Sequence, residues 1–199
     1  MPQPPDWAAE AIIRAGRRMD AQGWVPATAG NISQRIAPGR IAITASGVHK
    51  GMLAPRDVML VDAAGAAITP GLRPSAETGL HCQLYALLPE TEAVLHGHSV
   101  AATVLSQVTD AIELEGYELL KAFGSPTHEV RLTVPVVAND QDIPRLAAAI
   151  APALERGAPA YVIRGHGTYV WGRTMNEAMA RLEALEFLLA CTLERRRIA

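Results

Sequence analysis

Apolar residues recur every three to four positions in several segments of the chain, which is the spacing of one buried helix face. In the first such segment they include Ile12, Ile13 and Met19, and Gly23 is placed to end the helix. Pro74 and Ser75 open another segment, which a proline stops after Leu88. The pattern predicts helices over residues 7–22, 75–88, 100–107, 115–122, 144–155 and 174–196.

Shorter apolar runs rich in β-branched residues lie between these helices. They predict strands over residues 32–36, 41–44, 58–61, 93–98, 132–137, 161–164 and 168–171. Strands mix with helices throughout, we find no internal repeat or linker, and a chain of 199 residues suits one domain. We therefore expect a single α/β domain spanning residues 1–199, with helices on both faces of one sheet.

Composition narrows the class of partner. The formal net charge is −2, and the one basic cluster, Arg195–Arg197, lies at the end of a predicted helix, so we expect no nucleic-acid surface. No apolar run approaches the roughly 18 residues needed to span a membrane, and the first residues lack the features of a signal peptide. Cys82 and Cys191 fall in apolar helical patterns rather than in a disulfide framework. We expect a cytoplasmic protein with no membrane partner.

Three histidines stand out as candidate chemistry. His96 and His98 lie two apart at the end of a predicted strand, so both imidazoles should project from the same face. His166 has glycine on each side, in a turn between two strands. Three histidines with an open fourth position are typical of catalytic zinc. Spacing alone leaves packing and metal binding as comparable alternatives.

Other polar residues have both a structural and a functional interpretation. The chain has no nucleotide-binding glycine loop, but Asn31, Ser46–Gly47 and Ser75 could offer donors to a phosphate. Taken singly, each is better explained as a turn or a helix cap. Glu77 could be a carboxylate at a helix start paired with His81, and Glu118 one of several acids on an exposed helix face.

Five segments occur together in a characteristic order: TAGNIS (28–33), TASGVHKG (44–51), PSAETGLH (74–81), HGHS (96–99) and RGHGTYVWG (164–172). In this order the chain resembles the class II aldolase/adducin family over about residues 7 to 195. The resemblance implies a three-layer α/β/α sandwich around a mixed, mainly antiparallel sheet. It also implies a homotetramer with active sites near the subunit interfaces.

The same resemblance implies roles for individual residues. It places one zinc ion per subunit on His96, His98 and His166. Asn31, Ser46, Gly47 and Ser75 would bind a substrate phosphate, with Lys50 supplying charge. In the aldolases of the family the glutamate matching Glu77 moves protons beside the metal. In a dehydratase branch that role falls in the segment that contains Glu118, which we expect to be the main acid and base here, with Glu77 as a second proton carrier.

The chain resembles that dehydratase branch in the segment GYELLKAFG (116–124) and in Arg164, two residues before His166. This resemblance implies removal of water from a ketose 1-phosphate that carries a methylthio group. Two alternatives remain open. The first is a class II aldolase or pentulose-phosphate epimerase, which would use the same metal and phosphate pocket. The second is a non-catalytic scaffold like the adducin head, which would have no need of the three histidines.

Overall fold

The computed structural model describes residues 2–198. Within them, eight strands form one sheet in the order β3-β2-β1-β4-β8-β7-β6-β5. Neighbouring strands pair antiparallel except β6 and β7, which are parallel. The strands are β1 (Asn31–Ala37), β2 (Arg40–Thr44), β3 (Val58–Asp62), β4 (Ala93–Gly97), β5 (Ala111–Glu115), β6 (Arg131–Val137), β7 (Ala160–Ile163) and β8 (Gly167–Gly172).

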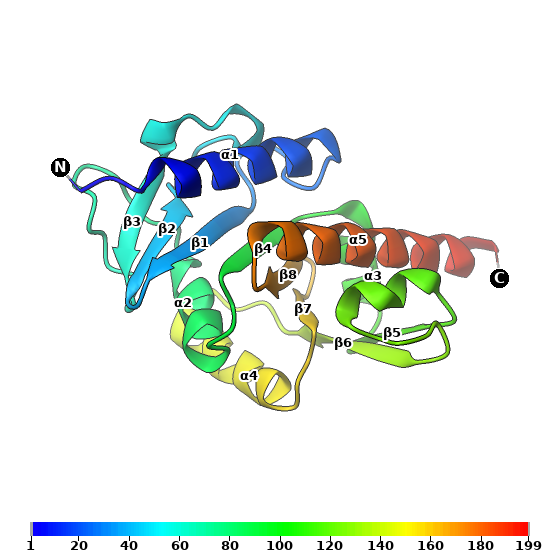
Figure 1. The fold of residues 1–199 in the computed structure, drawn as a ribbon. Helices are drawn as coiled ribbons and strands as arrows, with labels where there is room; N and C mark the ends of the chain where they lie inside the picture. The colour runs from blue at the N-terminus through cyan, green and yellow to red at the C-terminus, as the bar shows by residue number, and fades with distance from the viewer. Residues whose placement is uncertain (1, 199) are drawn as a thin grey trace.

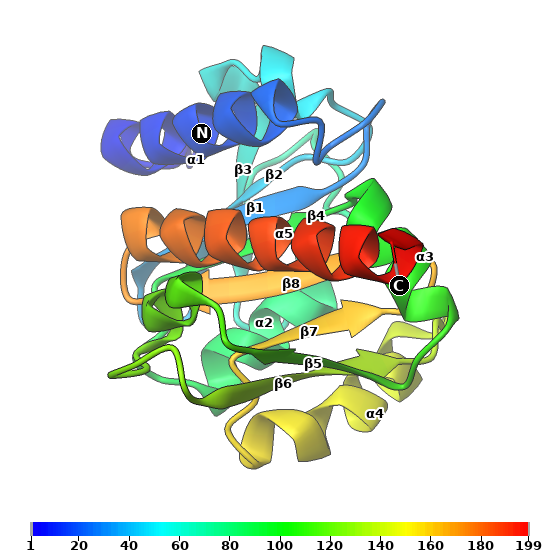
Figure 2. The same cartoon turned by 90° about the vertical axis from the view of Figure 1, so that its right-hand side faces the viewer.

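Helices cover both faces of this sheet (Figures 1 and 2). One face carries α1 (Asp6–Ala21), α3 (Val100–Gln107) and α5 (Met175–Ile198), and the other carries α2 (Thr78–Leu87) and α4 (Ile143–Glu155). Three 3-10 helices, η1 (Lys50–Met52), η2 (Pro55–Asp57) and η3 (Glu118–Phe123), lie in the connections. The expected three-layer α/β/α sandwich around a mixed, mainly antiparallel sheet is confirmed.

Two apolar cores follow from the alternation of side chains along the strands. On β4, Leu95 joins the core beneath α1, α3 and α5, whereas Val94 joins the core beneath α2 and α4. His96 lies two residues after Val94 on the same strand, so its side chain points to the same face of the sheet as that of Val94. A histidine is therefore directed into an otherwise apolar layer, where it needs polar partners.

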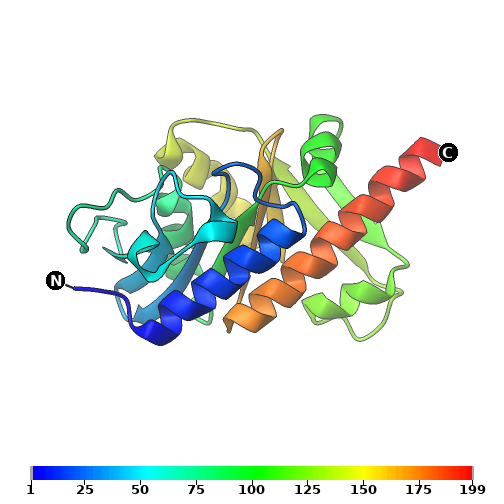
Figure 3. The ribbon, with the colours of Figure 1, turned by 90° about the horizontal axis from the view of Figure 1, so that it is seen from above.

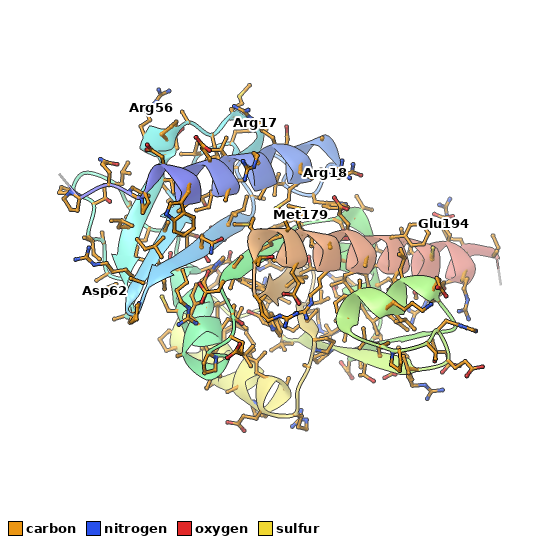
Figure 4. The ribbon with its side chains drawn as sticks, in the orientation of Figure 1. Arg17, Arg18, Arg56, Asp62, Met179 and Glu194 are labelled. Atoms are coloured by element: carbon orange, nitrogen blue, oxygen red, sulfur yellow. The ribbon has the colours of Figure 1, made fainter. Side chains whose placement is uncertain are left out.

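The helices α1 and α5 lie side by side and run in the same direction (Figure 3). Arg18 on α1 and Met179 on α5 line the seam between them (Figure 4). Arg18 Nε also donates to Glu183 Oε1 of α5 at 2.6 Å.

None of the helices within residues 2–198 has the length and apolar character needed to cross a membrane.

One predicted helix is wrong. Residues 115–122 contain the end of strand β5, a turn and the start of η3, and the strand over residues 111–115 was not predicted. Ile112 and Leu114 are buried while Glu113 and Glu115 are exposed, which is the period of a strand. Gly116 then adopts φ 76°, which ends the strand.

Two boundary shifts bear on the site. The helix predicted from residue 75 begins at Thr78, so Ser75 lies in the turn before it, and its Oγ accepts a hydrogen bond from the Glu77 amide at 3.3 Å. The strand predicted over 93–98 ends at Gly97, so His98 lies just beyond it. The other predicted elements are present with small shifts at their ends.

The antiparallel order brings several strand ends to one edge of the sheet. The C-terminal ends of β2 and β4 lie beside the N-terminal ends of β1 and β8. Asn31 opposes His96 across the β1–β4 pair, and Gly97 opposes Thr168 across the β4–β8 pair. The loops leaving these ends carry most of the polar residues singled out in the sequence, so they are gathered at this edge.

Candidate active site

The three histidines are brought together from two loops and one strand end. Their nearest ligand nitrogens all lie within 4.8 Å of one another. The Nε2 atoms of His96 and His98 are 2.9 Å apart, and the His166 ring centroid lies 5.1 Å from that of His96 and 4.6 Å from that of His98. The structure thus brings together the three histidines singled out in the sequence, and His98 reaches the cluster from beyond the strand.

The orientation of His96 is fixed from two directions. Its Nδ1 lies 2.9 Å from the carbonyl oxygen of Thr168, which accepts the ring proton and leaves Nε2 free as a lone-pair donor. The ring of Tyr169 stacks on the imidazole, with centroids 4.2 Å apart and planes 17° from parallel. The register of β4 against β8 pairs His96 with Tyr169 directly, so the strand pairing itself creates this stack.

The protonation state of the cluster suits a metal. Burial and the neighbouring His96 and His166 lower the pKa of His98 to about 3. Burial, followed by the charge of His96, also lowers the pKa of His166. Neutral imidazole is the form that binds metal ions. In a tetrahedral zinc site, ligand nitrogens lie about 3.3 Å apart, close to the spacing between His96 and His98. The residues fit a zinc ion.

Glu77 lies against the same cluster. Its carboxylate oxygens are 3.2 Å from Nε2 of His96 and 3.1 Å from Nε2 of His166. Asn31 Nδ2 donates to Oε2 at 2.7 Å. Burial alone would raise the pKa of Glu77, but the nearby histidines outweigh it and lower the pKa to about 2. The side chain is therefore a partly buried carboxylate held in place by an amide and two imidazoles.

A polar cavity of about 250 Å³ lies beside the histidines. It is lined by Thr28, Ala29, Gly30, Asn31, Ser46, Gly47, Ser75, Glu77, His98 and His166. Gly30 has φ 80°, and a Cβ there would collide with the carbonyl oxygen of His96, so only glycine lets this loop approach β4 so closely. All four residues that the resemblance assigned to a phosphate therefore line the same cavity as two of the histidines.

Two other expected site residues lie outside this lining. Lys50 is buried behind the loops, where Nζ donates to the carbonyl oxygens of Thr28 and Val48 at 2.7 Å each. Glu118 lies on η3 with its side chain 69% exposed, and its carboxylate pairs with Lys121 Nζ at 2.5 Å. Within residues 2–198 of one chain, Glu118 forms no hydrogen bond or ion pair with the histidine cluster.

Several residues near the site were not assigned from the sequence. Ser33 Oγ lies 2.7 Å from both His81 Nδ1 and the Tyr85 hydroxyl, forming a buried polar group beneath the cluster. Burial lowers the pKa of His81 to about 3, so this ring is neutral. Tyr169 also went unassigned, although its place opposite His96 would follow from pairing the two strands in register. That pairing could not be read from either strand alone.

Comparisons with known proteins agree with this geometry. The family model described as "Class II Aldolase and Adducin N-terminal domain" matches residues 10–193. The methylthioribulose-1-phosphate dehydratase of Granulibacter bethesdensis is 62% identical, covering 98% of this chain and 95% of the relative. That of Gluconacetobacter diazotrophicus is 61% identical, with 96% and 95% covered. Among solved structures, the L-fuculose-1-phosphate aldolase of Thermus thermophilus is 29% identical with a TM-score of 0.77, covering 94% of this chain and 93% of that one. The chain belongs to the class II aldolase and adducin family.

Proposed function

We propose that the chain is a zinc-dependent hydro-lyase of methionine salvage. Its reaction is the dehydration of 5-methylthioribulose 1-phosphate to 5-methylthio-2,3-dioxopentyl phosphate. The observation that carries the proposal is a single cavity in which convergent imidazoles and a carboxylate meet a group of hydroxyl, amide and backbone donors. The names of the two dehydratase relatives support this choice of substrate.

His96, His98 and His166 would hold one zinc ion per subunit. Three imidazoles leave a fourth position open, which is the arrangement of catalytic rather than structural zinc. When bound, zinc would act as a Lewis acid on the carbonyl end of the substrate. The carbonyl oxygen of Thr168 fixes the tautomer of His96 for this purpose, since it accepts the Nδ1 proton.

The loop residues would bind the phosphate. Asn31, Ser46 and Ser75 offer side-chain donors and Gly47 a backbone amide, all on the wall of the same cavity. A phosphate is well bound where several such donors converge. Because Asn31 already donates to Glu77, the amide also links the phosphate side of the cavity to the carboxylate beside the histidines.

Two carboxylates are available for proton transfer. We assign Glu118 as the main acid and base: it would remove the proton from C3 and return a proton to the departing C4 hydroxyl. Loss of that water leaves an enol, which tautomerises to the 2,3-diketone. Glu77 would be a second proton carrier, because it already touches His96 and His166 at the cavity wall.

The proposed role of Glu118 requires that several copies of the chain assemble. On one chain its side chain faces solvent and pairs with Lys121, so it can reach a cavity only if a neighbouring copy presents η3 there. We therefore propose a homotetramer with active sites near the subunit interfaces, built from single domains of residues 1–199. A cytoplasmic location completes the proposal, because phosphorylated sugars of central metabolism are held there.

Product analysis tests the proposal. Zinc-loaded protein would be incubated with 5-methylthioribulose 1-phosphate and, in parallel, with ribulose and fuculose phosphates, and products identified by mass spectrometry. Loss of one water from the methylthio substrate alone is the expected result. Turnover of an unsubstituted sugar phosphate with no dehydration of the methylthio substrate would overturn it.

A second function, that of a class II sugar-phosphate aldolase or epimerase, is favoured by one observation. Glu77 contacts the histidines directly, which is where a proton carrier for carbon–carbon cleavage would be needed. The L-fuculose-1-phosphate aldolase structure shares the fold. In that case cleavage or epimerisation products would appear in the same assay.

The remaining alternative, a non-catalytic scaffold, would carry no stoichiometric zinc. Metal analysis of protein purified without chelators tests this alternative.

A further inference from the structure

Lys50 is a buried cation without an acidic partner. Its side chain is 2% exposed, and its Nζ donates to the carbonyl oxygens of Thr28 and Val48 at 2.7 Å each. Within residues 2–198, no carboxylate oxygen lies within ion-pair distance of Nζ. A buried charge that only neutral dipoles compensate is costly, and burial accordingly lowers the pKa of Lys50 to about 8.

The two carbonyl groups belong to the two loops that form the wall of the cavity. Thr28 lines the cavity together with Gly30 and Asn31, and Val48 directly follows the lining residues Ser46 and Gly47. Lys50 itself is buried and is not among the lining residues, so its ammonium joins the two loops from within the protein. Loss of these two hydrogen bonds would allow the loops to move relative to each other.

The segment that carries Lys50 is itself held firmly. It begins η1, which packs against α1 so closely that a Cβ at Gly16 would collide with the Lys50 carbonyl oxygen. The side chain of His49 accepts a hydrogen bond from the Gly51 amide at 3.2 Å and caps η1. The position of the ammonium is thus set by the fold and not by a ligand.

The charge of Lys50 lies close to the cavity wall. Its Nζ is 2.7 Å from the carbonyl oxygen of Thr28, and Thr28 is one of the lining residues. Asp20 lies on α1, which packs against η1, and it faces His49, with 3.8 Å between Oδ1 and the ring Nε2. The positive field of Lys50 therefore remains available to an anion on the far side of the loops.

The choice of lysine is unusual for this chain. Only two of its 18 basic side chains, Lys50 and Lys121, are lysines. A compact ammonium can sit between two carbonyl oxygens and rotate its donors to both, whereas a planar guanidinium needs a wider space. Lysine is used where the fold requires a point charge in a confined position.

We propose that Lys50 is a positioning residue that holds the 28–31 and 46–48 loops together and supplies the fixed counter-charge for an anion in the cavity, without touching that anion. The inference rests on the proposed function only in that the substrate carries a phosphate. It predicts that inorganic phosphate, the simplest probe of that class, binds the cavity and that its binding depends on Lys50.

The first test observes Lys50 in the unaltered protein. Protein labelled with ¹³C and ¹⁵N in lysine side chains gives signals from only two residues, so Lys50 can be followed while inorganic phosphate is added to the zinc-loaded protein. We expect the Lys50 signal to shift saturably and the exposed Lys121 signal to stay in place. Saturable phosphate binding with no shift at Lys50 would overturn the proposal, as would no phosphate binding at all.

The second test uses Lys50→Met, Lys50→Arg and the matched surface variant Arg56→Met, whose cation lies exposed on η2 (Figure 4). We expect Lys50→Met to weaken phosphate binding by about tenfold or more and to raise KM more than it lowers kcat, with zinc content unchanged. Lys50→Arg, which keeps the charge but not the compact fit, should lie in between, and Arg56→Met should match the unaltered protein.

A merely structural role for Lys50 predicts a different outcome. Both Lys50 variants would then lose thermal stability while their phosphate affinity stayed that of the parent, and this result would contradict the proposal. If Lys50→Met fails to fold, the phosphate affinity of Lys50→Arg and the shift of the labelled Lys50 signal still test the proposal. Failure here leaves the dehydratase assignment standing, because product analysis of the methylthio substrate does not depend on free phosphate.

Discussion

The cavity region and the η3 region each present a glutamate and a lysine, in opposite surroundings. In the cavity region, Glu77 is held by Asn31 and two histidines, and Lys50 is enclosed between two loops. On η3, Glu118 and Lys121 pair with each other in solvent. Each charge around the cavity is fixed by the fold, whereas the charges on η3 compensate one another.

A site residue can thus be fixed in place within its own chain, or it can take its place only when chains assemble. Glu77 and Lys50 are positioned before any ligand arrives, so they need no reorganisation when one binds. The exposed Glu118 gains a defined position only when another surface meets it. A catalytic role for Glu118 is therefore a statement about the assembled protein, and a role for Glu77 is a statement about the single chain.

The largest expected effect is on catalysis by Glu118→Gln. Loss of the main acid and base should lower kcat for the methylthio substrate by about 10²- to 10⁴-fold. The melting temperature should change little, because glutamine has the same shape as glutamate and within its own chain Glu118 makes only an exposed ion pair. Steady-state kinetics and thermal unfolding measure the two effects. Glu115→Gln, an exposed acid paired with Arg131, is the matched control. Full activity in Glu118→Gln would transfer the central role to Glu77.

The next effect is on metal binding by Glu77→Gln. The carboxylate contacts His96 and His166 and favours the arrangement in which both rings face the same point. Because its oxygens lie beside the Nε2 atoms that would hold the metal, the carboxylate adds negative charge next to it, and we expect its loss to lower zinc affinity by about 10- to 100-fold. Competition titration with a chromogenic chelator measures the zinc affinity. Glu92→Gln, an acid beside Arg35, should bind zinc as the parent does. Equal affinity in Glu77→Gln would show that the contact does not support the metal.

A smaller effect concerns pH. The pKa of Lys50 is lowered to about 8 by burial, so the ammonium carries its charge below that pH and loses it above. Inorganic phosphate changes from mainly monoanion to dianion near about pH 7 and is almost wholly dianionic above pH 8, so its own charge is nearly constant while Lys50 loses its proton above pH 8. The dissociation constant of phosphate should therefore rise as the pH passes 8, by about tenfold per unit at most. On α1, which packs against η1, the carboxylate of Asp20 lies 3.8 Å from the ring Nε2 of His49.

Calorimetric titration of inorganic phosphate between pH 7 and pH 9 follows this change. Lys50→Arg keeps its charge throughout and should show no step near pH 8. A step of the same size in Lys50→Arg would assign the titration to another group.

The two regions also differ in how well the sequence predicted them. Around the cavity, ordered short motifs marked the histidines and the donor residues, and the structure gathers them at one sheet edge. The arrangement follows from antiparallel neighbours having opposite ends side by side. The burial of Lys50 could not be predicted, because it depends on how tightly η1 packs against Gly16 of a distant helix.

Around η3 the sequence was misleading. Three acids at residues 113, 115 and 118 suggested the exposed face of a helix over 115–122. The buried Ile112 and Leu114 set a period of two instead, because the neighbouring β6 offers a partner strand. A short segment with mixed signals takes the structure that its long-range pairing allows. For the same reason, the surroundings of Glu118 could not be derived from its own stretch of sequence.

The smallest effect is expected from Lys121→Met, which removes the partner of Glu118. Exposed ion pairs separated by one helical turn contribute little, because water and salt screen both charges. The melting temperature should stay within measurement error at low and at high salt, whereas stability lost at low salt alone would point to an unscreened pair. A fall of several degrees that disappears on dilution would instead show that the neighbouring copy contacts Lys121 as well as Glu118. Thermal unfolding across a concentration series therefore tests whether Lys121 stays exposed when the assembled protein takes up Glu118.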